Sequence, residues 1–83
     1  MIRVTIADDH PLMREGIKKI LNDEIDMNVV SEAGVEDDIM RILKETPSEV
    51  LILDITMKGR SWTHLVRDIS SRYPYLGVLI FST

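Results

Sequence analysis

Three aspartates stand where their carboxylates can act together if the fold joins them. Asp8 and Asp9 follow an apolar stretch near the N-terminus, and Asp54 follows the uninterrupted apolar run Val50–Leu53. Neighbouring carboxylates disfavour one another's ionised form, and a hard divalent cation relieves that repulsion. Mg²⁺ fits best, because it takes one or two carboxylates, a backbone carbonyl and several waters. Any one of these aspartates is equally well explained as a helix cap, so the prediction of a Mg²⁺ site rests on their combination.

Two alternating hydrophobic periods predict the elements that position these aspartates. Alternation at a period of two, or a short continuous apolar run, predicts strands. The strands are expected over Ile2–Ala7, Met27–Glu32, Val50–Leu53 and Val78–Phe81. Apolar stripes at helical spacing predict three helices. Their stripes are Leu12, Met13, Gly16, Ile17, Ile20 and Leu21; Val35, Ile39, Ile42 and Leu43; and Trp62, Leu65, Val66, Ile69 and Tyr73. Ser61 is expected to cap the third helix, and the acidic run 36–38 to form the first turn of the second.

The order of these elements, βαβαβαβ, predicts an α/β fold with a doubly wound parallel sheet. In the flavodoxin-like strand order 2-1-3-4, the first and third strands are neighbours, and ligands bind at the carboxyl ends of the strands. The polar residues Asn28 and Ser31 indicate that the second strand lies at an edge. Asp8, Asp9 and Asp54 should therefore meet at one rim of the sheet. Ser82 ends the fourth strand at the same rim, where its hydroxyl could donate to a phosphoryl oxygen.

Composition excludes several other classes of function. The chain has 83 residues, which predicts one domain spanning 1–83, and 14 acidic against 10 basic residues give a net charge of −4. That balance argues against a nucleic-acid-binding surface. The absence of cysteine excludes disulfides, thiolate zinc sites and thiol catalysis. The longest aliphatic or aromatic runs are four residues long, too short to span a bilayer. No signal peptide precedes the first strand, so we expect a cytoplasmic protein.

The two histidines, His10 and His64, are further candidate metal ligands. No second His or Cys stands at ligand spacing from either of them. We therefore interpret His10 as a solvated loop residue and His64 as part of an exposed helix face.

Three segments together resemble the receiver domain of bacterial response regulators. They are Ile6–Gly16 (IADDHPLMREG), Val29–Gly34 (VVSEAG) and Leu51–Met57 (LILDITM). Asp9–Gly16 is most similar to the NarL/FixJ subgroup, whose output half is a LuxR-type helix-turn-helix. The resemblance covers the whole chain and implies a phospho-acceptor module of two-component signalling, rather than an enzyme.

The resemblance also implies a role for each site residue. Asp54 would accept a phosphoryl group from the phosphohistidine of a histidine kinase. Asp9 would ligate Mg²⁺ directly and Asp8 mainly through water, with the backbone carbonyl of Thr56 completing the protein ligands. Ser82 matches the hydroxyl residue of the family that contacts the phosphoryl group.

The sequence also departs from the pattern of the family. Lys58 stands where the family usually has proline, and Trp62 where a small residue is common; Thr83 matches the small residue after Ser82. Receivers have five βα units, so we expect a truncated receiver without the fifth strand and the last two helices. The lysine that holds the phosphoryl group in the family lies on that fifth strand. Phosphorylation of this fragment is therefore expected to be impaired.

A second function stays open on these residues. A degenerate receiver without phosphotransfer would serve as an interaction module for dimerisation. The apolar fourth strand, with a neighbour on one side only, predicts a homo-oligomer formed by edge pairing or by exchange of elements. A haloacid-dehalogenase-type phosphatase is disfavoured, because it requires Asp-x-Asp where Asp8 and Asp9 are adjacent. A nucleotide-binding domain would need a glycine-rich loop after the first strand.

Overall fold

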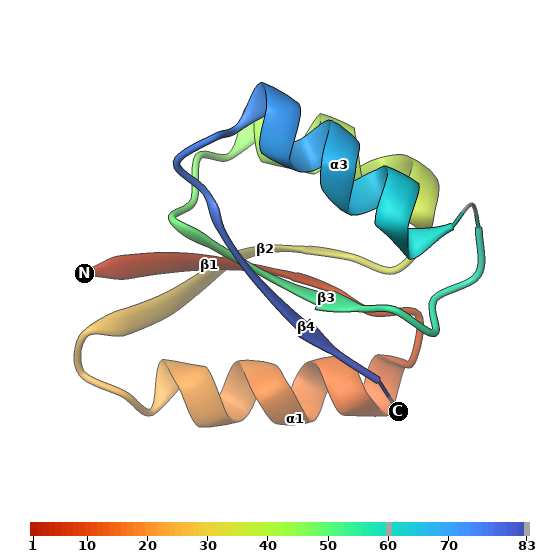
Figure 1. Cartoon of the computed structure of the whole chain (residues 1–83). Coiled ribbons are helices and arrows are strands. Elements are labelled where there is room, and N and C mark those ends of the chain that lie inside the picture. The colour runs from red at the N-terminus through yellow and green to blue at the C-terminus, as the bar shows by residue number, and fades with distance from the viewer. Residues whose placement is uncertain (60, 83) are drawn as a thin grey trace.

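A computed structural model describes residues 1–59 and 61–82 of the chain. Its elements are β1 (Ile2–Ala7), α1 (Pro11–Asn22), β2 (Met27–Ala33), the 3₁₀ turn η1 (Glu36–Asp38), α2 (Ile39–Glu45), β3 (Val50–Asp54), α3 (Trp62–Arg72) and β4 (Gly77–Phe81). The strands form one parallel sheet in the order β2-β1-β3-β4 (Figure 1). This confirms the predicted fold class and strand order, including the place of β2 at an edge.

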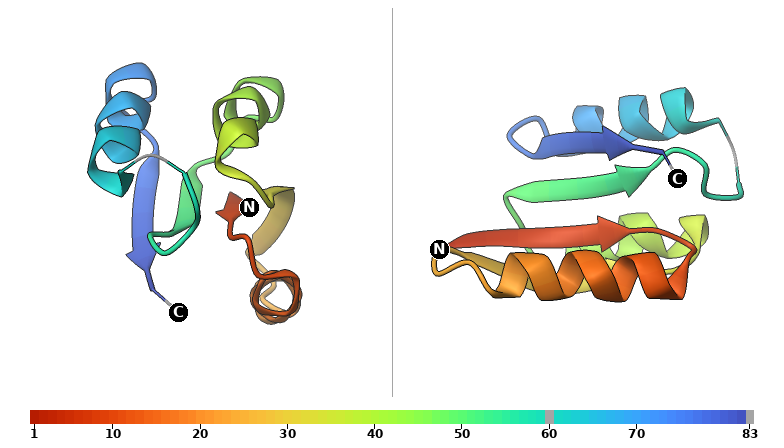
Figure 2. Two further views of the ribbon diagram at one scale, coloured as in Figure 1. Left: turned by 90° about the vertical axis from the view of Figure 1, so that its right-hand side faces the viewer. Right: turned by 90° about the horizontal axis from the view of Figure 1, so that it is seen from below.

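The helices lie on both faces of the sheet. Helix α1 covers one face, and α2 and α3 cover the other (Figure 2). Because successive side chains of a strand point to opposite faces, β3 supplies both cores. Leu51 and Leu53 pack with the buried residues of α2 and α3. Ile52 packs instead with β1 residues beneath α1. The continuous apolar run of β3 is thus explained by a strand that is covered on both faces.

The stripe that predicted α1 is only partly buried. The helix lies where the stripe predicts it, but Leu12 is 89% exposed and Ile20 is 66% exposed. Ile17 and Leu21 are the α1 residues packed against the smaller core cluster. The stripe extends over more of the helix surface than the sheet beneath it contacts, and its outer positions are left in solvent.

The start of α2 and the capping of α3 differ from the predictions. The acidic run forms the separate turn η1, and Val35 before it is exposed, so neither belongs to α2. Ser61 occupies the N-cap position of α3, but its side chain makes no capping bond to the backbone. Its hydroxyl is instead hydrogen-bonded to the Thr63 hydroxyl at 2.7 Å. The extra polar partner within the first turn explains why the predicted cap is missing.

Two further features of the fold are an exposed strand and the character of the helices. Among the described residues, strand β4 pairs with β3 alone, and its side chains Leu79 and Ile80 are exposed. Within the two described ranges, no helix has the length and apolar character needed to cross a membrane.

Candidate functional site

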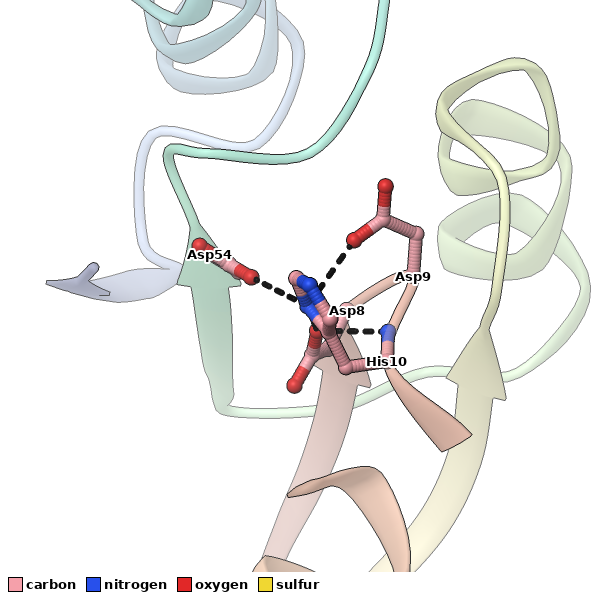
Figure 3. Close-up of side chains that lie close together, drawn as sticks. All are labelled: Asp8, Asp9, His10 and Asp54. Atoms are coloured by element: carbon pink, nitrogen blue, oxygen red, sulfur yellow. Dashed lines mark hydrogen bonds and ion pairs between the residues drawn. The ribbon is translucent and has the colours of Figure 1, made fainter. Parts of the chain in front are cut away.

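The carboxyl ends of β1 and β3 bring the three aspartates together (Figure 3). Ala7 is paired with Leu53, so the residues that follow each of them, Asp8 and Asp54, lie side by side. Both side chains are fully buried, whereas that of Asp9 is 23% exposed. One atom from each of these aspartates and one from His10 lie within 4.8 Å of one another. The convergence expected from the strand order is therefore present.

His10 also belongs to this cluster, although it is an exposed loop residue, as predicted. Its Nδ1 lies 3.1 Å from Asp8 Oδ1, 3.1 Å from Asp9 Oδ1 and 3.4 Å from Asp54 Oδ2. The hydrogen bond with Asp8 raises the pKa of the His10 imidazole; desolvation opposes this, and the charges of Asp9 and Asp8 add to it. The ring thus lies among the carboxylates as a positive or hydrogen-bonding partner.

A local turn brings His10 into place. The Asp8 carboxylate accepts the backbone N–H of His10 at 2.9 Å, the pattern in which an aspartate bonds the main chain two residues on. Pro11 then begins α1. This Asp-x-His-Pro pattern was visible in the sequence. Spacing to a second His or Cys does not identify this partner, because the groups that surround His10 are the neighbouring carboxylates.

The carboxylates keep buried oxygens without hydrogen-bond partners. These atoms are Asp8 Oδ2, Asp9 Oδ1 and Asp54 Oδ2. One imidazole N–H forms one good hydrogen bond, here to Asp8, so the other carboxylate oxygens lack a donor. Buried anionic oxygens without donors are unfavourable unless a cation pairs with them. The donor set, with oxygen atoms from three carboxylates, therefore fits Mg²⁺.

The two oxygens of Asp54 have different surroundings. Oδ1 accepts hydrogen bonds from the Thr56 backbone N–H at 2.8 Å and from the Thr56 hydroxyl at 2.6 Å. Oδ2 faces the cluster. Burial raises the pKa of the Asp54 carboxyl, but the hydrogen bonds, led by those from Thr56, outweigh it and hold the pKa below its ordinary value. Asp54 is thus an ionised carboxylate with one oxygen anchored and the other directed into the site.

Arg14 supports the main chain that carries the acidic pair. Its Nη1 donates to the carbonyl oxygen of Asp8 at 2.6 Å, and its Nε donates to Glu32 Oε1 on β2 at 2.9 Å. Lys18 donates to the other oxygen of Glu32 at 2.8 Å. A Cβ on Gly34 would lie 2.9 Å from Arg14 Nη1, so the guanidinium lies directly against that glycine. Helix α1 and strand β2 together hold Asp8 in position.

With this geometry established, comparison with known proteins shows the family. The model of the response regulator receiver domain matches residues 4–83. The chain belongs to the response regulator receiver domains. The uncharacterized transcriptional regulatory protein YxjL of Bacillus subtilis is 39% identical over 82 residues, which cover 99% of this chain and 38% of that protein. The chain therefore spans less than two fifths of the length of this relative.

Solved structures agree with this assignment. The isolated receiver domain of RcsB from Salmonella enterica serovar Typhimurium, studied with the phosphomimetic BeF₃⁻, has a TM-score of 0.89 and 31% identity, covering 98% of this chain and 61% of that one. A LuxR-family response regulator from Aurantimonas has a TM-score of 0.90 and 28% identity, covering 99% of this chain and 59% of that one. The relatives are NarL/LuxR-type response regulators, which confirms the expected subgroup.

The backbone of Lys58 contacts Asp9. Its N–H lies 3.3 Å from Asp9 Oδ2 and donates to it. A proline at this position, which the resemblance to the family leads one to expect, would have no N–H to donate. The next residue, Gly59, has a φ of +142°, and a Cβ there would lie 2.9 Å from Glu36 Cβ. The hydrogen bond from Lys58 thus ties Asp9 to the loop between β3 and α3.

The remaining predicted site residues lie at the same rim. Ser82 directly follows Phe81, which is paired with Asp54, and it is exposed. The Ile55 N–H donates to the Phe81 carbonyl oxygen at 2.9 Å, which holds the end of β4 beside Asp54. Thr56 lies in the loop after Asp54, where its amide and hydroxyl contact the carboxylate. Ligation by its carbonyl stays a prediction, and Thr83 lies outside the described residues.

Proposed function

We propose that this receiver is the phospho-acceptor module of a two-component system and that Asp54 accepts the phosphoryl group. The observation that carries this proposal is the unequal environment of the Asp54 oxygens: Thr56 anchors Oδ1, and Oδ2 faces the acidic cluster. In the proposed transfer, Asp54 Oδ2 attacks phosphorus while the phosphorus–nitrogen bond of a phosphohistidine on a histidine kinase breaks. The products are an aspartyl phosphate and free histidine. The related RcsB receiver was studied with a phosphomimetic.

The other site residues support this transfer. We assign Asp9 as the direct metal ligand, Asp8 as a ligand mainly through water, and the Thr56 carbonyl as the third protein ligand. Ser82 would donate its hydroxyl proton to a phosphoryl oxygen. When bound, Mg²⁺ supplies neutralisation of the charge that develops between carboxylate and phosphate. The protein contributes the buried, preorganised carboxylates at the carboxyl ends of β1 and β3.

The first test is Mg²⁺ binding, because the site must hold the ion whether or not transfer is fast. Isothermal titration should show Mg²⁺ binding to the wild-type chain. Asp54→Asn should weaken it by about tenfold or more, since losing even a supporting group of a metal site costs roughly 10–100-fold. Asp26→Asn, at an exposed residue between α1 and β2, serves as the matched control and should leave the affinity unchanged. Equal affinities for Asp54→Asn and wild type would contradict the assignment.

The 83-residue chain itself is expected to accept phosphate slowly. Among residues 1–59 and 61–82, no lysine or arginine forms an ion pair with Asp54. Removing one preorganised charge-stabilising contact slows a reaction by roughly 10²–10³. Incubation with acetyl phosphate and Mg²⁺, followed by intact-mass measurement, should show a small fraction of singly phosphorylated chain, mapped to Asp54 and absent in Asp54→Asn. Rapid, near-stoichiometric phosphorylation would contradict this expectation.

The exposed fourth strand favours one alternative function. Leu79 is 60% exposed and Ile80 39% exposed on a strand that pairs on one side only, so we propose that this chain forms a homo-oligomer through β4 or by exchange of elements. A degenerate receiver would keep this association without phosphotransfer. The absence of any Mg²⁺ binding by the wild-type chain would favour that module over the phospho-acceptor.

We further propose that residues 1–83 act as one receiver domain in the cytoplasm, where the kinase would present its phosphohistidine. The net charge of −4 supports a partner other than nucleic acid for this part of the protein. Any contact with DNA would belong to a separate output domain of a longer parent.

A further inference from the structure

We propose that His10 makes the acidic site a mixed nitrogen and oxygen ligand set for a borderline divalent cation, of which Zn²⁺ is the representative, in competition with Mg²⁺. The inference rests on the proposed function for its consequence, which is blocked phosphorylation. The binding itself depends on the geometry of four side chains from two loops: Asp8, Asp9, His10 and Asp54 (Figure 3).

The distances around His10 Nδ1 match those between neighbouring ligands of one ion. Ligand atoms about 2.0–2.1 Å from a tetrahedral Zn²⁺ lie roughly 3.3 Å from one another. The oxygens of Asp8, Asp9 and Asp54 lie 3.1, 3.1 and 3.4 Å from Nδ1. The four donor atoms all lie within 4.8 Å of one another. Closing them on one ion thus needs shifts on the order of 1 Å, which side-chain rotation supplies.

The cluster also contains acceptors that need a cation. Asp8 Oδ2 and Asp54 Oδ2 belong to fully buried side chains and have no hydrogen-bond partner. The ring of His10 is 53% exposed, so a metal ion can reach Nδ1 from the solvent side without opening the core. The site is therefore both accessible and short of positive charge.

Ligand chemistry distinguishes the two cations. Mg²⁺ takes oxygen ligands and keeps several waters, so His10 contributes little to its binding. Imidazole nitrogen suits Zn²⁺, Cu²⁺ and Ni²⁺, which bind mixed nitrogen and oxygen sites more tightly. The imidazole at position 10 thus shifts the selectivity of the site toward these metals. A bound Zn²⁺ would also occupy Asp54 Oδ2, the atom proposed to attack phosphorus.

The test compares both metals in matched variants. Affinities for Zn²⁺ alone and Mg²⁺ alone are measured by titration calorimetry at the same fixed pH of about 8 for every variant, above the ordinary range of an imidazole because the hydrogen bond with Asp8 raises the pKa of His10. His10→Ala and His10→Gln should weaken Zn²⁺ binding by about 10–100-fold. The same variants should change Mg²⁺ affinity by less than about threefold. His64→Ala, at an exposed position on α3, is the control and should change neither.

A spectroscopic readout reports the ligands directly. Co²⁺, used in place of Zn²⁺, should give the visible absorption of a four-coordinate ion in the wild-type chain, and His10→Ala should lose it. Equal Zn²⁺ affinities in wild type and both His10 variants would overturn the proposal, as would loss of binding in His64→Ala instead. Zn²⁺ binding that depends on His10 in a chain that does not bind Mg²⁺ would support this inference and contradict the proposed function, so the two failures are distinguishable.

Discussion

At the scale of single residues, Thr56 controls the charge of Asp54. Its hydroxyl and amide both donate to Asp54 Oδ1. Because these bonds hold the pKa of Asp54 below its ordinary value, they stabilise the fold above the unfolded pKa, and this contribution is lost as the pH falls through the folded pKa. Thr56→Val keeps the backbone carbonyl and removes the hydroxyl bond. We expect a free energy of unfolding about 1 kcal/mol lower at neutral pH.

Thr56→Val should also raise the pKa of Asp54, so that acid unfolding begins at a higher pH than in the wild type. Carbon NMR titration of the Asp54 carboxyl and urea unfolding across the acidic range measure the two effects. Thr63→Val, on the exposed side of α3, is the matched control and should leave the pKa of Asp54 in place. An unchanged Asp54 titration in Thr56→Val would show that the Thr56 hydroxyl does not lower the pKa of Asp54.

The residues of the site were predictable to different degrees. Asp8, Asp9 and Asp54 could be placed together from sequence, because strand order fixes which carboxyl ends meet. His10 could not be placed by the same reasoning, since its position depends on a turn made by one side chain, the bond from its N–H to Asp8. The donation from the Lys58 backbone to Asp9 was equally hidden, because it joins two loops that are 49 residues apart in the sequence.

At the scale of elements, α1 and β2 hold the acidic pair through Arg14. Gly34→Ala tests this link without removing any charged group, because the added Cβ would lie 2.9 Å from Arg14 Nη1 and displace it from the Asp8 carbonyl. We expect a loss of stability of about 1 kcal/mol. Mg²⁺ affinity should fall several-fold, because the main chain that carries Asp8 is then less firmly held.

Gly16→Ala on α1 is the control for this substitution. Nothing lies within 4 Å of the Cβ it adds, and alanine is the better helix former, so it should stabilise the chain by about 0.5–1 kcal/mol. Urea unfolding and Mg²⁺ titration of the two variants measure the difference. If Gly34→Ala binds Mg²⁺ as tightly as Gly16→Ala does, the link from Arg14 to the site has no effect on metal affinity.

The elements show why periodicity predicts type better than environment. The four strands and three helices occur in the segments that the hydrophobic pattern predicts, although α2 begins only at Ile39. The exposure of Leu12 and Ile20 was not predictable, because a stripe shows that a helix has an apolar side and not how much of it the sheet covers. The run 36–38 forms a separate 3₁₀ turn, a common geometry at helix starts that acidic composition does not distinguish from a first α-helical turn.

At the scale of the whole molecule, the sheet is covered unequally. Helices α2 and α3 lie over one face, and α1 alone lies over the other, toward the β1 side (Figure 2). The edge strand β4 carries no charged residue, and three of its five residues are exposed. An uncharged, apolar edge is a template for pairing with another strand. The surface most in need of a partner is therefore the exposed edge of β4, whose carboxyl end is paired with Asp54.

This unequal cover predicts that the 83-residue chain associates through β4. Light scattering at micromolar concentration should give at least twice the monomer mass. Leu79→Lys places a charge on the exposed strand, where charged side chains oppose edge pairing, and should shift the chain toward monomer. Ile25→Lys adds the same charge at a residue that is 94% exposed in the connection between α1 and β2, and should leave association unchanged. A folded wild-type monomer would exclude β4 as the interface, because the chain would then not associate at all. Equal dissociation by both substitutions would also exclude it, because the added charge alone would then explain the masses.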